Sequence, residues 1–131
     1  MLIVIDFDGV LFNSRLFKIA YEKIFRLHGV SKQDYARTYR RASRGRGGIY
    51  SSERHLKLLQ SRYPSLEHRV IMRKLLLLAD KSKAYVFADA RPFLGFFKKK
   101  KATIALLSSG APKFQRKKIK GWFEKMGNNQ I

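Results

Sequence analysis

Two aspartates, Asp6 and Asp8, stand two residues apart at the end of the apolar run formed by residues 2–5. One carboxylate there can attack phosphorus and form an aspartyl-phosphate, and the second can protonate the leaving oxygen and later activate water. Two acids this close repel each other, and Mg²⁺, which takes oxygen ligands, would neutralise them. The alternative interpretation is a solvated turn after a strand. An EF-hand does not fit, because Gly9 is misplaced and a strand precedes the pair.

Two hydroxyls, Ser108 and Ser109, end a second apolar run, ATIALL at residues 102–107, and Gly110 follows them. Hydroxyl and main-chain N–H groups at this point could hold a transferring phosphoryl group; the alternative is a loop that merely caps a strand end. Both runs are continuously apolar, which predicts strands covered on both faces in a parallel sheet. In open α/β sheets ligands bind beyond the carboxyl ends of the strands, so we expect the acids and the hydroxyls at one edge.

The elements that must position these groups are mostly helical. Hydrophobic periodicity and capping residues predict helices over residues 14–29, 31–44, 51–63, 65–87, 92–101 and 113–126. The first of these helices is expected to bury Leu16, Phe17, Ala20, Tyr21, Ile24 and Leu27. The fold class is therefore α/β, a parallel-sheet core with an inserted all-helical cap. The expected domains are a core segment at 1–13 with the first strand and catalytic loop, a cap at 14–88, and a core segment at 89–131 with the second strand and flanking helices.

Composition limits the partners. The chain has 29 lysines and arginines against 9 aspartates and glutamates, a net charge of +20, which attracts phosphorylated metabolites, nucleic acid or an acidic membrane surface. Arginines cluster in one stretch: Arg37, Arg40, Arg41, Arg44 and Arg46. We expect this stretch to be a solvated face of the cap, with contact to the anionic part of a substrate or to nucleic acid as alternatives.

The absence of cysteine excludes disulfides and thiolate metal sites and fits a cytoplasmic location. The N-terminus lacks the basic segment and the long apolar run of a signal peptide. The leucine run LLLL at residues 75–78 is far too short to span a bilayer, so no membrane association is expected.

The motifs at the two strand ends resemble those of the haloacid dehalogenase (HAD) superfamily. The first family motif is an apolar strand followed by Asp-x-Asp-Gly-(Thr/Val)-(Leu/Val), and LIVIDFDGVLFNS at residues 2–14 fits it throughout. The second is an apolar strand ending in Ser or Thr, and TIALLSSG fits it with Ser108 in that position. The helical insertion is similar to the α-helical cap of the phosphoglycolate phosphatase and β-phosphoglucomutase branch.

This resemblance implies a HAD-like Rossmannoid core and a Mg²⁺-dependent phosphatase that acts on a small phosphorylated substrate. It implies Asp6 as the nucleophile, Asp8 as the general acid and base, and Ser108, with Ser109 beside it, as the phosphate-binding residues. It also implies that Mg²⁺ binds the Asp6 carboxylate and the main-chain carbonyl of Asp8.

The chain departs from the family in two motifs. The family has a third motif, a lysine, and a fourth motif, one or two acids; Lys113, Lys117 and Lys118 follow Ser108 too closely for the third. We therefore expect the N-terminal part of a longer protein, with a C-terminally incomplete core and weak or no activity of its own. The alternatives are a non-catalytic basic protein that binds nucleic acid or another polyanion, and a degenerate fragment. The oligomeric state stays open.

Overall fold

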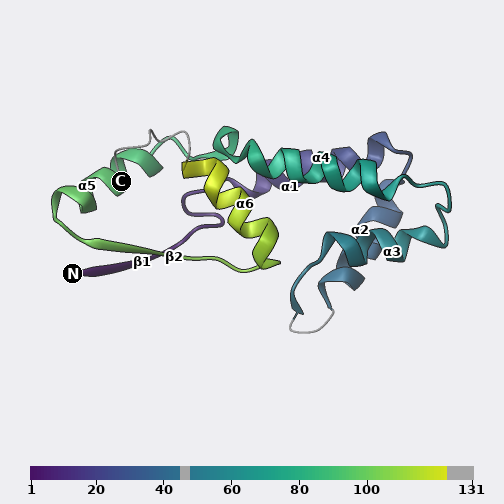
Figure 1. The fold of residues 1–131 in the computed structure, drawn as a ribbon, viewed down its shortest axis with the longest axis horizontal. Helices are drawn as coiled ribbons and strands as arrows, with labels where there is room; N and C mark the ends of the chain where they lie inside the picture. The colour runs from purple at the N-terminus through teal and green to yellow at the C-terminus, as the bar shows by residue number, and fades with distance from the viewer. Residues whose placement is uncertain (45–47, 124–131) are drawn as a thin grey trace.

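The structure, a computed structural model, describes residues 1–44 and 48–123 of the 131-residue chain (Figure 1). Its elements are β1 (Leu2–Asp6), α1 (Ser14–Leu27), α2 (Lys32–Ser43), α3 (Ser52–Gln60), α4 (His68–Asp80), the 3₁₀ helix η2 (Ser82–Tyr85), α5 (Ala90–Lys99), β2 (Thr103–Leu107) and α6 (Pro112–Phe123). The fold is mixed α/β, as the sequence predicts. Arg46 and residues 124–126 of the last expected helix lie outside the described residues.

The two strands form a parallel pair. Their register runs from Leu2 opposite Thr103 to Asp6 opposite Leu107, so both carboxyl ends reach the same edge. One face joins the core, through the buried Ile5, whereas Leu2 and Val4 on the other face are 63% and 60% exposed. Coverage on both faces was the expectation from the sequence. The described residues cover only one.

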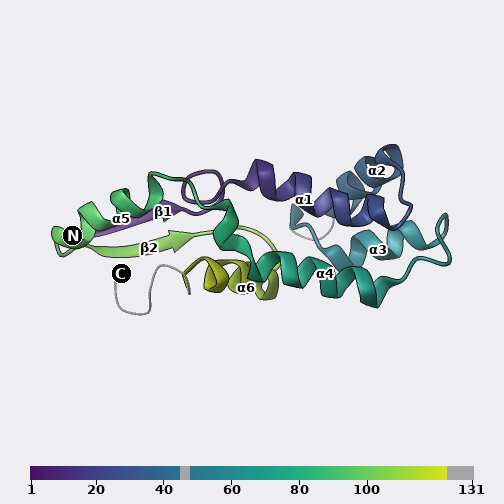
Figure 2. The ribbon, with the colours of Figure 1, turned by 90° about the horizontal axis from the view of Figure 1, so that it is seen from above.

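The molecule is elongated, with the sheet and α5 at one end and α2 and α3 at the other (Figure 1). Figure 2 shows α1 and α4 running between the two ends, with α6 beside α4. The buried stripe of α1 is formed by Phe17, Tyr21 and Phe25 at four-residue intervals, and successive ring centroids lie 6.2 and 5.6 Å apart. The expected face was partly wrong, because the stripe follows these rings and leaves Leu16 and Leu27 exposed. No helix within residues 1–44 and 48–123 is long and apolar enough to cross a bilayer.

The chain enters and leaves the helical part through two segments that pair with each other. The Asn13 N–H donates to the Tyr85 carbonyl at 2.6 Å, and the Phe87 N–H donates to the Leu11 carbonyl at 3.1 Å. Phe12 and Val86 form an antiparallel bridge between these two bonds. This pairing requires extended backbone after residue 85. The single helix predicted over 65–87 is therefore wrong: α4 ends at Asp80, and η2 leads into the extended segment.

Gly121 of α6 allows that helix to lie directly against the end of α4. A methyl group at this position would lie 2.5 Å from the Asp80 carbonyl oxygen and 3.0 Å from Ser82 Oγ. We expect Gly121→Ala to lower the free energy of unfolding by about 2 kcal/mol, because backbone must shift to admit the methyl group. Urea denaturation measures this. The control is Gly95→Ala in α5, where a methyl group meets nothing within 4 Å and better helix propensity adds up to about 1 kcal/mol. Equal effects of both substitutions would contradict the close packing.

Candidate functional site

The tight turn after β1 holds Asp8 just beyond the strand. The N–H groups of Leu11 and Phe12 both donate to the Phe7 carbonyl at 3.1 Å, and the Gly9 N–H donates to the Phe12 carbonyl at 2.8 Å. Gly9 has φ 81°, a conformation that glycine adopts without strain. The motif residue at position 9 thus shapes the turn that carries the carboxylate.

The carboxylate of Asp8 accepts hydrogen bonds from three other elements. Ser14 Oγ at the start of α1 donates to Oδ1 at 3.1 Å, and Ser108 Oγ after β2 donates to Oδ2 at 3.3 Å. From α6, Gln115 Nε2 donates to Oδ2 at 3.2 Å, and Lys118 Nζ lies 2.6 Å from Oδ1. The parallel pairing of β1 and β2 therefore brings Asp8 and Ser108 together, as the sequence predicts, and α6 adds a cation that it does not predict.

The ammonium group of Lys118 is enclosed by one carboxylate and three aromatic rings. Its side chain is only 6% exposed, against 27% for Asp8. Nζ lies 4.5 Å from the ring centroid of Phe12, 5.2 Å from that of Phe17 and 5.7 Å from that of Phe7, distances at which a cation is attracted to the ring face. Burial lowers the pKa of Lys118 below its ordinary value, and the Asp8 carboxylate opposes that shift.

Asp6 and Ser109 lie differently from these residues. Asp6 is exposed, and its carboxylate has no hydrogen bond or ion pair within the described part of the chain. Ser109 is also exposed, and its main-chain carbonyl accepts a hydrogen bond from Gln115 Nε2. Of the four residues predicted for the site, the structure brings Asp8, Ser108 and Ser109 into one cluster and leaves Asp6 outside it.

A cavity of about 590 Å³ opens between the strand ends and the helices. Its polar side is lined by Asp8, Gly9, Ser14, Ser109, Gly110, Gln115 and Lys118. Aromatic and aliphatic groups also line it, namely Phe17, Tyr21, Tyr39, Ile49, Tyr50 and Phe114, together with the polar residues Lys18, Ser43 and Ser52. A charged group and a large apolar surface therefore face the same space, an arrangement typical of small-molecule sites.

A chain of hydrogen bonds leads from this cavity into the helical part. Tyr21 OH lies 2.7 Å from Tyr50 OH, which lies 2.9 Å from His55 Nδ1, and His55 Nε2 lies 2.8 Å from Thr38 Oγ1. Thr38 Oγ1 donates to the Asp34 carbonyl at 2.6 Å. Since that hydroxyl has one proton, His55 Nε2–H must donate to Thr38, Tyr50 to His55, and Tyr21 to Tyr50. Burial raises the pKa of Tyr21 and of Tyr50 and lowers that of His55 to about 4. These three hydrogen-bonded side chains are therefore uncharged at pH 7.

The magnesium site that the resemblance implies, with the Asp6 carboxylate and the main-chain carbonyl of Asp8 as ligands, stays a prediction. Both oxygens of Asp8 are engaged by donors, one of them the Lys118 ammonium group, and Asp6 does not line the cavity. Within residues 1–44 and 48–123 no three His, Asp or Glu side chains gather into a group that could hold a metal ion.

Gln115 and Lys118 are the site residues that the sequence did not predict. Sequence signals for Lys118 do exist: it follows Phe114 by one helical turn and directly precedes Ile119, so it falls within the apolar stripe of α6. A lysine in such a stripe indicates a buried charge with a partner. Comparisons of the chain with models of protein families, with curated proteins and with solved structures found no match.

Proposed function

We propose that this chain binds a phosphate monoester in the cavity and hydrolyses it through an aspartyl-phosphate, as a HAD-like phosphatase. The observation that carries the proposal is the cluster of Asp8, Ser108 and the buried Lys118 at the carboxyl ends of two parallel strands. This edge is where an open α/β sheet binds its ligand. The cluster supports the chemistry that the motifs at residues 6–9 and 103–110 imply.

Several groups on the polar side suit a phosphoryl group. Lys118 supplies positive charge, Ser14 and Ser109 supply hydroxyl groups, and α6 begins at Pro112, immediately after Gly110 and Ala111 in the cavity wall. The start of a helix carries partial positive charge and free N–H groups, which favour an anion. Gln115 Oε1 is buried without a partner among the described residues and can accept a hydrogen bond from a bound ligand.

The aromatic and aliphatic residues that line the cavity indicate the class of substrate. Tyr39, Tyr50 and Phe114 present rings to the cavity, and Ile49 adds an aliphatic surface. Such a wall favours an ester whose alcohol part is apolar or aromatic over a sugar phosphate, which needs many hydrogen-bond partners. The substrate we propose is a phosphate monoester with an apolar or aromatic alcohol.

In the proposed reaction the Asp6 carboxylate forms a bond to phosphorus while the bond to the leaving oxygen breaks, and Asp8 gives that oxygen a proton. Asp8 then takes a proton from water, whose oxygen attacks phosphorus and releases Asp6. Asp8 must first exchange Lys118 for a proton, after which the ammonium group can face the phosphoryl oxygens. Because Asp6 does not line the cavity, the first step also requires its carboxylate to turn toward Asp8.

Hydrolysis of p-nitrophenyl phosphate, an aromatic monoester, tests the proposal when measured with and without Mg²⁺. We expect Asp6→Asn to lower the rate at least about 100-fold, since the amide is no nucleophile. Asp6 is exposed, so this substitution leaves the fold intact. The matched control is Asp80→Asn, which removes a carboxylate paired with Lys117 elsewhere on the surface and should not change the rate. An unchanged rate in Asp6→Asn, or no hydrolysis by the unaltered chain under either condition, would refute the proposal.

A further inference from the structure

We propose that α2 carries a second binding surface, which holds the phosphate backbone of nucleic acid. This surface, here the arginine face, consists of Arg37, Arg40 and Arg41 on α2, Arg44 directly after α2, and Arg62 after α3. It shares no lining residue with the cavity described above. The inference is independent of the proposed phosphatase activity.

The arginines form one continuous stripe. Arg44 and the three arginines on α2 follow the spacing i, i+3, i+4 and i+7, which places them on one side of the helix, and all four are exposed. From Arg37 to Arg44 the stripe extends about 10 Å, since each helical residue rises 1.5 Å. That length matches about three successive phosphates along one strand of a duplex.

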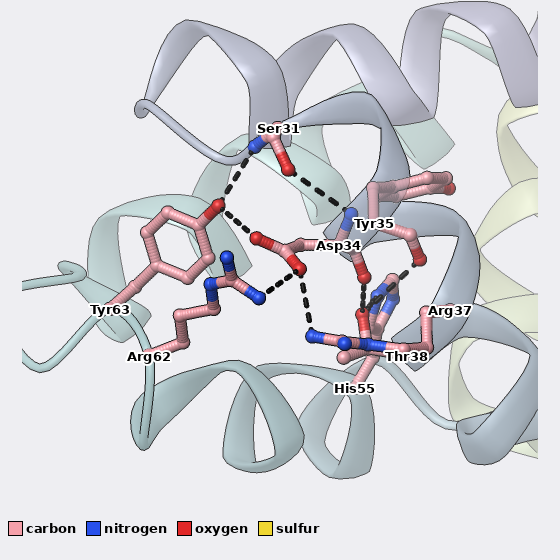
Figure 3. A network of polar contacts seen from close by, with 8 residues as sticks. All are labelled: Ser31, Asp34, Tyr35, Arg37, Thr38, His55, Arg62 and Tyr63. Atoms are coloured by element: carbon pink, nitrogen blue, oxygen red, sulfur yellow. Dashed lines mark hydrogen bonds and ion pairs between the residues drawn. The ribbon is translucent and has the colours of Figure 1, made fainter.

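A buried carboxylate fixes one end of the stripe (Figure 3). Asp34 Oδ1 lies 2.8 Å from Arg37 Nη2 and 3.2 Å from Arg62 Nη1, so two guanidinium groups from different segments are held side by side. Tyr63 OH donates to Asp34 Oδ2 at 2.6 Å, and the Ser31 N–H donates to that hydroxyl at 3.0 Å. The hydrogen bond from Tyr63 is the main cause that holds the pKa of Asp34 below its usual value. This network orients the arginines before any ligand binds.

The guanidinium groups keep donors for a ligand. The side chains of Arg37 and Arg62 remain more than half exposed although both contact Asp34. With Arg40 they line a shallow depression of about 410 Å³, in which three positive charges face one negative charge. Arginine offers five N–H donors in a planar fork that matches phosphate oxygens in pairs. The depression is therefore an anion site with a net positive charge.

In the protein without a ligand, the arginines of the stripe repel one another and destabilise α2. Like charges three and four residues apart on a helix repel. The acid in α2, Asp34, contacts Arg37 and Arg62 at one end of the stripe and leaves the rest of the stripe without an acidic partner on this helix. The helix dipole favours Arg40 and Arg41 in the last turn but not Arg37. A ligand with regularly spaced negative charges removes the repulsion along the whole stripe.

The occupant is nucleic acid rather than a membrane or a small phosphate. None of the large hydrophobic side chains exposed in the described residues lies on α2, so this helix has no apolar face to insert between lipids. A single small phosphate would satisfy only the arginines of the depression. An extended polyanion contacts all five, and binding through phosphates is the general mode of nucleic-acid recognition.

Fluorescence anisotropy with a labelled RNA single strand of about 20 nucleotides, and with a labelled DNA duplex, tests the proposal. The variant is Arg40→Gln/Arg41→Gln/Arg44→Gln, which keeps both arginines bound to Asp34 and so preserves the fold. The control, Lys98→Gln/Lys99→Gln/Lys100→Gln at the exposed end of α5, removes the same charge elsewhere. We expect the arginine variant to bind at least about tenfold more weakly and to show a smaller salt dependence, because about three phosphate contacts are lost.

The outcomes separate the alternatives. A clear loss in the arginine variant and a change of less than about threefold in the lysine control would support the arginine face, and the more affected probe would identify RNA or DNA as the ligand. Equal weakening in both variants would assign binding to the net charge alone and overturn the proposal. Displacement of the RNA by polyglutamate of the same length at equal concentration would assign the face to acidic protein segments, and would also overturn it. Phosphatase activity should be equal in both variants.

Discussion

Asp8→Asn is expected to lower the free energy of unfolding by about 3 kcal/mol or more, because it leaves the ammonium group of Lys118 buried without a counter-charge. Lys118 is the buried member of the pair, with a side chain 6% exposed against 27% for Asp8. The rings of Phe7, Phe12 and Phe17 still attract the cation and offset part of the loss. Urea denaturation at neutral pH measures the effect.

Lys118→Met is expected to lower the free energy of unfolding by less than Asp8→Asn does, by about 1 kcal/mol. Methionine keeps the unbranched stem against the same rings. The Asp8 carboxylate that remains is partly solvated and keeps its bonds from Ser14, Ser108 and Gln115. The substitution therefore removes the buried ammonium group, whose desolvation costs more free energy, and leaves the partly exposed Asp8 carboxylate.

The double variant Asp8→Asn/Lys118→Met completes a double-mutant cycle. We expect its stability to lie near that of Lys118→Met alone, since the asparagine then faces no buried charge, with a coupling energy of about 3 kcal/mol. Additive losses would contradict the ion pair. Equal losses in the two single variants would contradict the asymmetry of burial on which the prediction rests.

The part of the site that could be predicted from the sequence is the part set by local rules. Continuous apolar runs predict parallel strands, and parallel strands bring their carboxyl ends together, which correctly places Asp8 near Ser108. Side chains alternate between the two faces of β1, so Asp6 lies with Leu2 and Val4 on the face that the described residues leave open. The motif alone does not show which face is open.

The place of Lys118 in the site depends on distance in space, which its position along the chain does not reveal. Ten residues separate Ser108 from Lys118, which the family resemblance makes too few, yet α6 turns back over the strand ends and places Gln115 and Lys118, one turn apart, against Asp8. The long helix expected over 65–87 failed for a related reason. Helical periodicity continues past Asp80, but pairing of Val86 with Phe12 requires extended backbone and overrides it.

The hydrogen-bonded chain from Tyr21 to Thr38 makes the helical part sensitive to acid. His55 is fully buried, accepts from Tyr50 at Nδ1 and donates at Nε2, so its neutral form satisfies both nitrogens. A second proton on the ring would leave Nδ1 and the Tyr50 hydroxyl as two facing donors. Burial accordingly lowers the pKa of His55 to about 4 in the folded chain, against 6.5 ordinarily.

We therefore expect the free energy of unfolding to fall by up to about 3 kcal/mol between pH 6.5 and pH 4. The unfolded chain binds a proton at His55 in this window and the folded chain does not, so acid favours unfolding. Asp34, whose pKa is lowered from 3.8, contributes a loss only at still lower pH. Urea denaturation at about pH 7, 6, 5 and 4 measures the slope over this window.

His55→Gln removes the titrating group and is expected to flatten this slope, whatever its effect on stability at pH 7. Glutamine cannot gain a proton, so the free-energy difference between the variant and the unaltered chain should shrink steadily as the pH falls. The control is His68→Gln, at the start of α4, away from the hydrogen-bonded chain, which should keep the original slope. An unaltered slope in His55→Gln would show that the acid sensitivity lies elsewhere, and a flattened slope in His68→Gln would assign it to the wrong histidine.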